Sequence, residues 1–296
     1  MILNQLKYLN MGVTVLYSEI FKSIQGEGHY TGVPTTWLRF FGCNLECNGF
    51  GQDDPTDPST YKLPYKDFEI IDTQIIEDLP VWKYGCDSSY SWSKKFAKIQ
   101  HNESCEEVAK KLYDQMYDET THIAFTGGEP LMKAAQKNTV KILTEINRLL
   151  GRGKRFTNIT WETNGTRPLD ITLQNYLQSI EHATELFFSV SPKLWNTAGE
   201  KDGIQPEIVK QYHDLSDVGQ LKFVCNGTDE SWNEIEESII KFRKVGVNYP
   251  IWIMPVGATE ESQQDNAKEI TIQTMDRGYN VAARVHCYIF GNQIGT

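Results

Sequence analysis

From about residue 103 onward, the apolar residues switch repeatedly between a strand-like and a helix-like spacing. Residues 123–125 form a short apolar run typical of a buried strand, whereas residues 140–150 carry apolar side chains at helical spacing. Further strands are expected at 156–161, 186–190, 221–225, 251–254 and 281–285. This alternation predicts an α/β fold with a parallel sheet. Because about six such units are fewer than a closed barrel needs, we expect a partial TIM-like barrel of parallel strands with outer helices.

One region interrupts this pattern. Residues 48–85 contain Asp53-Asp54-Pro55-Thr56-Asp57-Pro58, which is typical turn chemistry, and Pro64 and Pro80 add further breaks. We therefore interpret 48–85 as an inserted loop region, with regular structure expected only around 68–76. The whole chain, 1–296, is expected to form a single domain around it.

The charge balance limits the class of partner. Asp and Glu number 39 against 29 Lys and Arg, a net charge of −10, which argues against direct nucleic-acid binding but allows a local basic pocket for a small anion. The sequence has no run of 18 apolar residues, so no membrane span is expected. Because the segment Met1–Lys7 lacks the apolar stretch of a secretory signal, we expect a cytoplasmic protein with reduced cysteines.

Two cysteines, Cys43 and Cys47, follow the strand expected at 36–41, and Cys86 is a third candidate ligand. In a reducing compartment, clustered thiols are more often metal ligands or catalytic groups than disulfides. Zinc usually takes four nitrogen or sulfur ligands in pairs, and no second pair is present. Of the remaining three, Cys105 falls in an expected helix, Cys225 in an expected strand and Cys287 near the end of the chain, and all are interpreted as core or semi-buried thiols.

Polar or glycine-rich sequences follow other strands. Gly-Gly-Glu-Pro occupies 127–130, after the strand at 123–125, and Glu-Thr-Asn-Gly-Thr occupies 162–166. In parallel α/β folds, ligands gather at the carboxyl ends of the strands. Two glycines allow close backbone approach, so backbone carbonyls or a carboxylate there could accept from an ammonium group. Taken alone, the Gly-Gly-Glu-Pro could equally be an ordinary turn between a strand and a helix.

Taken together, these motifs resemble a radical S-adenosylmethionine (SAM) enzyme. The chain further resembles the 7-carboxy-7-deazaguanine synthase family of the queuosine pathway. The residues that carry this resemblance are 19–28 (Glu-Ile-Phe-Lys-Ser-Ile-Gln-Gly-Glu-Gly), 37–43, 86–88, 162–166 and 189–193 (Ser-Val-Ser-Pro-Lys). The family usually has a third cysteine three residues after the second, where this chain has Phe50. Since the entropy of closing a loop grows only slowly with length, an insertion between Cys47 and Cys86 explains the difference.

The resemblance implies a [4Fe–4S] cluster on Cys43, Cys47 and Cys86, with SAM on the open iron. It also implies Mg²⁺ at Ser88, a hydroxyl that stands where the family commonly has threonine. Implied SAM contacts are Gly85, Asp87, Gly127, Gly128, Glu129, Glu162, Thr163, Asn164, Ser191, Pro192 and Lys193. Implied substrate contacts are Ile24, Gln25, Gly26, Arg39, Thr126 and Thr296, with Arg39 expected to form a bidentate contact with a carboxylate.

The activity implied by the resemblance is that of a radical SAM lyase. Such an enzyme converts 6-carboxy-5,6,7,8-tetrahydropterin to 7-carboxy-7-deazaguanine with loss of ammonia, by a ring contraction that a 5′-deoxyadenosyl radical initiates. The resemblance also implies a homodimer and a one-electron donor such as flavodoxin or ferredoxin. Two alternatives remain at this point: an activating enzyme of the glycyl-radical type, and a zinc-stabilised binding module without enzymatic activity.

Overall fold

A computed structural model describes residues 14–72, 74–117, 122–151, 156–291 and 293–296. Met1–Lys7, on which the expectation about a secretory signal depends, lies outside these residues. The described chain forms one nine-stranded sheet in the order β3-β1-β2-β4-β5-β6-β7-β8-β9. Seven of these strands run parallel: β2 (Pro34–Phe40), β4 (His122–Gly127), β5 (Asn158–Thr163), β6 (Glu185–Val190), β7 (Gly219–Cys225), β8 (Ile251–Pro255) and β9 (Asn280–Val281). The sheet does not close, so the expected partial barrel is confirmed.

The other two strands were not expected from the alternating pattern. β1 (Thr14–Ile24) and β3 (His101–Ser104) pair antiparallel with their neighbours at one edge of the sheet. At the opposite edge, β9 ends at Val281 instead of extending to residue 285. The chain leaves the sheet there because Val285 N donates to Gly26 O at 2.9 Å and begins a helix.

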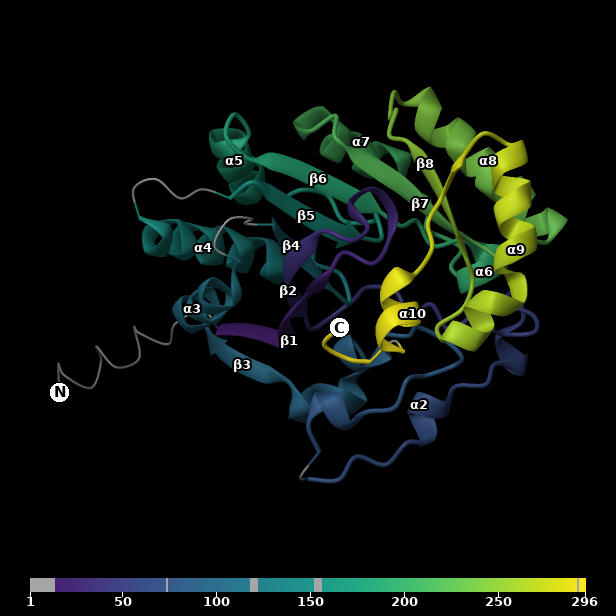
Figure 1. Ribbon diagram of the computed structural model, residues 1–296, viewed down its shortest axis with the longest axis horizontal. Coiled ribbons are helices and arrows are strands. Elements are labelled where there is room, and N and C mark those ends of the chain that lie inside the picture. Colours follow the sequence, from purple (N-terminus) through teal and green to yellow (C-terminus); the bar gives the residue numbers. More distant parts are fainter. Residues whose placement is uncertain (1–13, 73, 118–121, 152–155, 292) are drawn as a thin grey trace.

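Helices cover the outer face of the curved sheet, with α4, α5, α7, α8 and α9 arranged around it (Figure 1). The helices and their bounds are α2 (Pro64–Asp67), α3 (Cys105–Gln115), α4 (Lys133–Leu150), α5 (Ile171–Ile180), α6 (Trp195–Ala198), α7 (Pro206–Leu215), α8 (Asp229–Lys244), α9 (Glu260–Asp276) and α10 (Val285–Phe290). Helix α10 and the C-terminus lie across the open side of the sheet (Figure 1). No helix in the part of the chain described is both long and apolar enough to cross a membrane.

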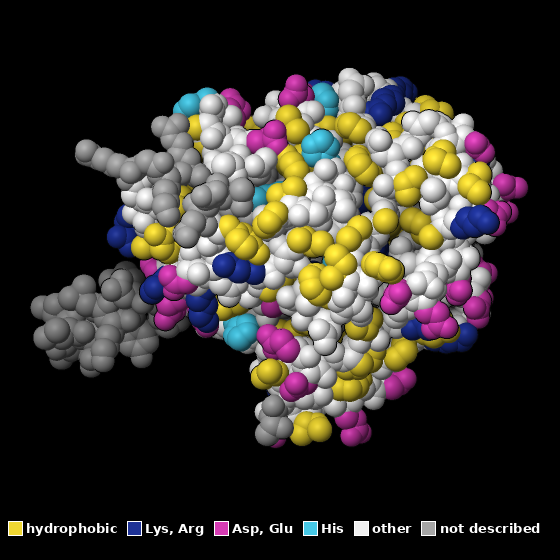
Figure 2. All heavy atoms as spheres, in the orientation of Figure 1, with side chains coloured by type: hydrophobic (Ala, Val, Ile, Leu, Met, Phe, Trp, Pro, Cys, Tyr) yellow, Lys and Arg dark blue, Asp and Glu magenta, His cyan; other side chains and the backbone are white. Residues whose placement is uncertain are grey.

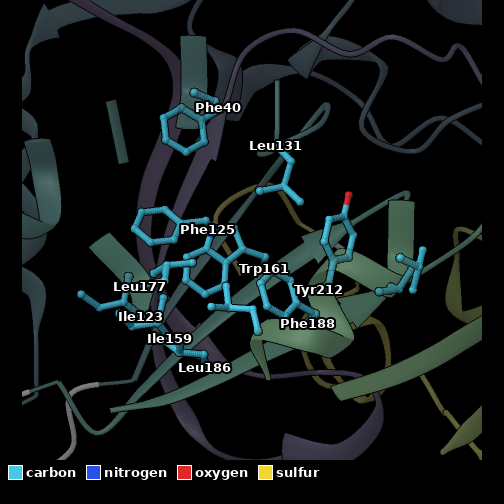
Figure 3. Packing of buried hydrophobic residues seen from close by; sticks show 14 of the residues in the cluster. Phe40, Ile123, Phe125, Leu131, Ile159, Trp161, Leu177, Leu186, Phe188 and Tyr212 are labelled. Atoms are coloured by element: carbon cyan, nitrogen blue, oxygen red, sulfur yellow. The ribbon is translucent and has the colours of Figure 1, made fainter. Parts of the chain in front are cut away.

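A row of aromatic rings forms the core between the sheet and these helices (Figure 3). Phe125 of β4 lies 5.8 Å from Trp161 of β5, which lies 5.2 Å from Phe188 of β6, measured between ring centroids. Tyr212 of α7 continues the row at 5.0 Å from Phe188. All four residues are fully buried. Because β4, β5 and β6 each contribute one large ring to this row, the face of the sheet that carries the rings is the one that packs against the helices.

The outward direction of these aromatic rings determines which side chains point to the inner face of the sheet. Because successive side chains of a strand point to opposite faces, the neighbours of outward rings point inward. Thr126 and Glu162 therefore face the inside of the partial barrel, beside Phe125 and Trp161. In β7, Lys222 lies between buried Leu221 and Phe223 and faces inward for the same reason. The sheet thus directs polar side chains into its own concave side.

The inserted region has a hydrophobic cluster of its own. Tyr65, Trp82 and Phe96 are among its buried members, and Ile294 packs against it from the end of the chain. Among the described residues of 48–85, regular structure is limited to α2 and short 3-10 turns, so the expectation of regular structure around 68–76 is wrong there except at Ile76. Because its apolar side chains pack on each other and on residues 90–99, the insertion is an ordered cap at the lower side of Figure 1.

Charged side chains of both signs are scattered over the visible surface. Asp and Glu side chains are frequent along the margin at the right of the view, where α9 lies, and Lys and Arg side chains lie among them (Figure 2). Helix α9 itself begins with Glu260 and Glu261 in its first turn, where carboxylates interact favourably with the helix dipole.

Candidate active site

A cavity of about 260 Å³ opens at the carboxyl ends of β2, β4, β5, β7 and β8. The structure brings almost all of the predicted site residues to it. Those that line it are Ile24, Gln25, Gly26, Arg39, Cys43, Cys47, Gly85, Cys86, Asp87, Ser88, Thr126, Gly127, Gly128, Glu162, Thr163, Asn164, Ser191, Lys193 and Thr296. Residues from segments more than 250 positions apart thus converge on one hollow, as the parallel topology predicts.

The two ends of the segment 48–85 lie next to each other. Gly85 N donates to Phe50 O at 2.8 Å, so residue 85 lies beside the position that the family usually gives to its third cysteine. Gly85 has φ +80°, a conformation that glycine adopts without strain. Cys86 therefore lines the same cavity as Cys43 and Cys47, although 38 residues separate Cys47 from Cys86.

The three thiols are free, and Cys47 is buried while Cys43 and Cys86 are half-buried. Burial raises the pKa of Cys43 to about 12 and that of Cys86 to about 11. The thiolate forms therefore need a cation, which iron would supply, and the donor set fits a three-thiolate cluster site. In the described residues, no three or more His, Cys, Asp or Glu side chains are placed to hold one ion. A cluster does not require such a group, because each thiolate binds its own iron.

The loop that carries Cys43 packs tightly on the turn after β4. A Cβ at Gly128 would lie 2.4 Å from Gly42 O and 2.8 Å from Cys43 Cβ, so only glycine permits this contact. From the next strand end, Asn164 Nδ2 lies 3.8 Å from Cys43 Sγ. The Gly-Gly motif and the Asn164 amide therefore orient the first thiol.

Two predicted residues, Glu129 and Pro192, do not line the cavity. Glu129 is fully buried, and its carboxylate accepts from Leu131 N at 2.9 Å, Thr163 Oγ1 at 2.7 Å and Asn164 N at 2.8 Å. These bonds tie the turn after β4 to the turn after β5 and commit most of the accepting capacity of the carboxylate. The backbone around Gly127 and Gly128, in contrast, lines the cavity.

Glu162 takes part in a buried ionic network on the inner face. Its Oε1 accepts from Gln25 Nε2 at 2.8 Å, and its Oε2 lies 3.1 Å from Lys222 Nζ. Lys222 also pairs with Glu27 at 2.5 Å and has a side chain only 4% exposed. Burial alone would lower the pKa of Lys222, but Glu162 and Glu27 outweigh it and raise that pKa. Glu162 is thus held on the side of the cavity that Gln25 occupies.

Arg284 joins Glu27 to the segment after Cys86. Its Nε lies 2.9 Å from Glu27 Oε1, and its Nη2 lies 2.7 Å from Asp87 Oδ2. Burial alone would raise the pKa values of both carboxyls, but Arg284, together with Lys222 at Glu27, lowers them. His286 packs beside Gly26 and lines the cavity, and burial lowers its pKa to about 4. Asp87 therefore holds the third cysteine segment to α10 through Arg284.

Arg39 is fixed along one edge of its guanidinium. Its Nε lies 2.6 Å from Glu19 Oε1, which also accepts from Tyr90 Oη at 2.8 Å. Its Nη1 donates to Ser88 Oγ at 3.4 Å, and Ser88 Oγ in turn donates to Asp87 Oδ1 at 3.1 Å. Arg39 therefore keeps its terminal nitrogens, but not Nε, for a ligand carboxylate.

Lys193 and Ser191, from the loop after β6, also line the cavity. Lys193 Nζ donates to Ser191 Oγ at 2.8 Å and lies 5.8 Å from the ring centre of Phe50. Thr296 lines the cavity while its Oγ1 donates to Gln293 O at 2.6 Å. Both ends of the described chain, β1 and the C-terminal residue, therefore contribute to one site.

Sequence reasoning missed several charged residues of this site. Glu19, Glu27, Lys222 and Arg284 form its ion pairs, and Tyr90 completes the contact around Glu19. A signal for Lys222 was present, because a lysine between apolar neighbours in a strand must either be exposed or be paired on the inner face. The partners themselves are 20 to 257 positions apart, which no local pattern reveals.

No family model matches the chain. Among curated proteins, the 7-carboxy-7-deazaguanine synthase of Halobacterium salinarum is 26% identical over 293 residues, covering 95% of this chain and 92% of the relative. That of Rhodopirellula baltica is 25% identical over 287 residues, covering 96% and 89%. A segment of 31 residues is 58% identical to the synthase of Bacteroides thetaiotaomicron, covering 10% of this chain and 17% of that one.

By sequence, the chain is similar to 7-carboxy-7-deazaguanine synthases. The resemblance expected from the motifs is confirmed over nearly the full length. The crystal structure of QueE from Escherichia coli has the same fold, with a TM-score of 0.53 at 18% identity, covering 95% of this chain and 98% of that one. The first two relatives thus match nearly the full length of the chain.

Proposed function

We propose that the protein is a radical SAM lyase that converts 6-carboxy-5,6,7,8-tetrahydropterin to 7-carboxy-7-deazaguanine with loss of ammonia. The observation that carries this proposal is the convergence of three free thiols and a buried ionic network on one cavity. Relatives that bear the name of this activity match 92% and 89% of their own lengths. The alternatives, a glycyl-radical type activating enzyme and a zinc-stabilised module, do not account for these relatives.

Cys43, Cys47 and Cys86 would hold a [4Fe–4S] cluster, and SAM would occupy its open iron. Cluster and SAM, when bound, supply a 5′-deoxyadenosyl radical, which is the hard part of the chemistry. The chain contributes placement and exclusion of water. The backbone around Gly127 and Gly128 accepts the ammonium of SAM, while Ser191 and Lys193 lie where its carboxylate or sugar can be bound.

The substrate would lie on the opposite side of the cavity, against Gln25 and Arg39. Gln25 and Glu162 present amide and carboxylate edges to the donors and acceptors of a pterin, and their mutual bond of 2.8 Å holds both in place. Arg39 offers its terminal nitrogens to the carboxylate of the substrate. Ile24, Gly26, Thr126 and Thr296 shape the walls.

We assign Mg²⁺ to Ser88. Its hydroxyl lines the cavity and lies 3.4 Å from Arg39 Nη1, so a cation there would share the substrate carboxylate with Arg39. Mg²⁺ commonly takes few protein ligands and completes its shell with substrate and water.

The assembly and context follow the same proposal. The chain, 1–296, acts as one domain in which 48–85 is an insertion that caps the site. It forms a homodimer, works in the cytoplasm and receives electrons from a flavodoxin or a ferredoxin. The ring of charges that supports the site consists of side chains bonded within one chain, so a second copy is not needed to complete it.

Anaerobic reconstitution with iron and sulfide tests the proposal. The wild type should bind four irons per chain and convert the tetrahydropterin to the deazaguanine when SAM and a reductant are present. Cys86→Ala should lose the cluster, whereas Cys105→Ala, in a buried thiol of α3, should keep it. Four irons per chain in Cys86→Ala would contradict the insertion hypothesis. A colourless wild type that binds zinc would favour the binding module.

A further inference from the structure

The loop that carries Cys47 is held by a residue that the sequence analysis did not single out. Glu200 follows α6, and its Oε1 accepts from two successive backbone amides, Glu46 N at 3.0 Å and Cys47 N at 2.7 Å. Glu200 is only partly exposed and does not line the cavity. Its carboxylate therefore contacts the backbone of Cys47 and does not reach the residue from the cavity.

Cys47 adopts a backbone conformation that needs such support. With φ +51°, it is the only non-glycine residue of the described chain in the left-handed region. For an L-residue this conformation is unfavourable, because the Cβ atom comes too close to the following carbonyl oxygen. The two amides bonded to Glu200 belong to this residue and the one before it, so the carboxylate stabilises the strained turn directly.

A second contact fixes the same loop to the same turn. Gly49 N donates to Ala198 O at 3.0 Å. A Cβ at Gly49 would lie 2.6 Å from Ala198 C and from Gly199 N, so only glycine allows the two backbones to meet. The loop is therefore held on both sides of Cys47, by Glu200 before it and by Ala198 after it.

The turn that carries Glu200 is itself anchored. Glu234 of α8 accepts from Trp195 N at 2.7 Å and from Asn196 N at 2.8 Å, which fixes the start of α6. Helix α8 packs on the outer face of the sheet through buried side chains such as Trp232 and Phe242. A rigid helix is thus connected through α6 to the loop of the second thiol.

We propose that Glu200 is the positioning residue of the second cluster ligand. It holds Cys47 in the left-handed conformation that directs its thiolate at the cluster, and it places a negative charge next to the iron that this thiolate binds. The inference rests on the proposed function in one respect: the three thiols must hold an iron–sulfur cluster. The two effects are separable, because glutamine keeps the accepting oxygen but removes the charge.

The first test needs no cluster. Amide hydrogen exchange is measured by mass spectrometry on the apo protein, over peptides that span residues 43–50. Glu200→Ala should speed up exchange there at least tenfold, since both amides lose their acceptor, whereas Glu200→Gln should stay near the wild type. Asp202→Asn, an exposed carboxylate in the same turn, is the matched control and should change nothing.

The second test uses the reconstituted protein. Midpoint potentials are measured by anaerobic titration followed by electron paramagnetic resonance. Glu200→Gln should keep four irons and show a more positive potential, because removal of a nearby negative charge favours the reduced cluster. Glu200→Ala should lose iron to a chelator several times faster than Asp202→Asn does.

The outcomes separate the inference from the proposed function. Exchange in Glu200→Ala at the rate of the Asp202→Asn control would overturn the positioning role. An unchanged potential in Glu200→Gln would overturn the role of the charge. If Glu200→Ala does not fold, the midpoint potential of Glu200→Gln tests the inference: a more positive value supports it and an unchanged value contradicts it. A wild type that binds no cluster refutes the proposed function, while the exchange experiment still decides whether Glu200 holds the loop.

Discussion

At the scale of single residues, Ser88 shows how a small side chain can serve several neighbours. Its hydroxyl accepts from Arg39 and donates to one carboxylate oxygen of Asp87, whose other oxygen is paired with Arg284. The oxygen keeps a lone pair toward the cavity, so it can also bind a hard cation. The predictions at this scale concern that cation and one buried histidine.

Ser88→Ala should abolish most of the stimulation of turnover by Mg²⁺ while leaving the cluster intact. The change removes one oxygen ligand from a cation that tolerates poor geometry badly, and it does not touch a cysteine. Ser88→Thr keeps the hydroxyl and should behave nearly as the wild type. Steady-state turnover against Mg²⁺ concentration is the measurement. An identical Mg²⁺ response in wild type and Ser88→Ala would place the metal elsewhere.

His122 should make the protein less stable as the pH falls. It is 2% exposed, and burial lowers its pKa from 6.5 to about 4. The unfolded chain therefore binds a proton at higher pH than the folded one, so the stability contribution is complete above about pH 6.5 and is lost as the pH falls toward 4. The loss amounts to about 3 kcal/mol at most.

His122→Gln removes the titrating group and retains partners for Thr35 and Thr160, which contact the ring nitrogens. The free energy of unfolding is measured by denaturant titration between pH 7 and pH 4. The variant should show a shallower decrease than the wild type over this range. Parallel pH profiles for the two proteins would show that His122 does not control this part of the acid response.

The same scale shows which site residues the sequence could reveal. Cys43, Gly128 and Asn164 were found because each belongs to a short motif at a strand end, where backbone geometry alone places it. Lys222 and Arg284 were missed because their roles depend on partners brought together by folding. The hydrogen bonds of Glu129 were not foreseen for the same reason, since two of the three come from the end of the next strand.

At the scale of elements, α10 is the helix whose local sequence agrees least with its structure. Val285–Phe290 is rich in β-branched and aromatic residues, which favour a strand, yet the segment is helical. Arg284 occupies the N-cap position without a side-chain cap bond, because its side chain pairs with Glu27 and Asp87. These tertiary ion pairs override the local preference for a strand. By contrast, α3 was predictable, because Ser104 and Glu107 form a capping box and its apolar face has helical spacing.

Gly26→Ala should displace α10. The added Cβ would lie 1.8 Å from His286 Nδ1, so the imidazole and the helix that carries it must move. We expect Km for the substrate to rise at least tenfold, with SAM binding less affected because the glycine lies on the Gln25 side of the cavity. The measurement compares Km for the substrate with the affinity for SAM.

The double variant Gly26→Ala/His286→Ala is the control for this prediction. Removing the imidazole opens the space that the new Cβ requires, so Gly26→Ala should cost much less in a His286→Ala background than alone. Equal losses in both backgrounds would show that the close contact is not the cause. Since Gly26 has an ordinary negative φ, backbone strain does not enter.

At the scale of the whole molecule, the protein has two hydrophobic cores, and segments packed on each of them line the same cavity. The main core lies between the sheet and the outer helices, and the smaller one lies between the insertion and residues 90–99 and reaches Ile294. The alternating pattern predicted the first core, because each strand and helix is periodic on its own. The second could not be predicted, since its members are scattered between residues 63 and 99 without periodicity.

Trp82→Ala should loosen the insertion without unfolding the barrel. The side chain is 5% exposed and contacts Phe68 and Phe96, so its loss should cost about 3–5 kcal/mol locally. Limited proteolysis should cut first within residues 51–84, while the far-ultraviolet circular dichroism of the remainder is retained. Ile240→Ala, at an exposed position of α8, is the control. Simultaneous loss of all structure would show that the two cores fold as one.

The bond between Gly85 and Phe50 has a consequence for how such sites can diversify. Because Gly85 and Phe50 meet, the polypeptide between them can change its length and composition while Cys86 stays at the same cavity as Cys43 and Cys47. The position of the third thiol depends on where the backbone returns and not on the number of residues in between. Proteins of this kind are therefore better grouped by where their backbone re-enters than by the spacing of their cysteines.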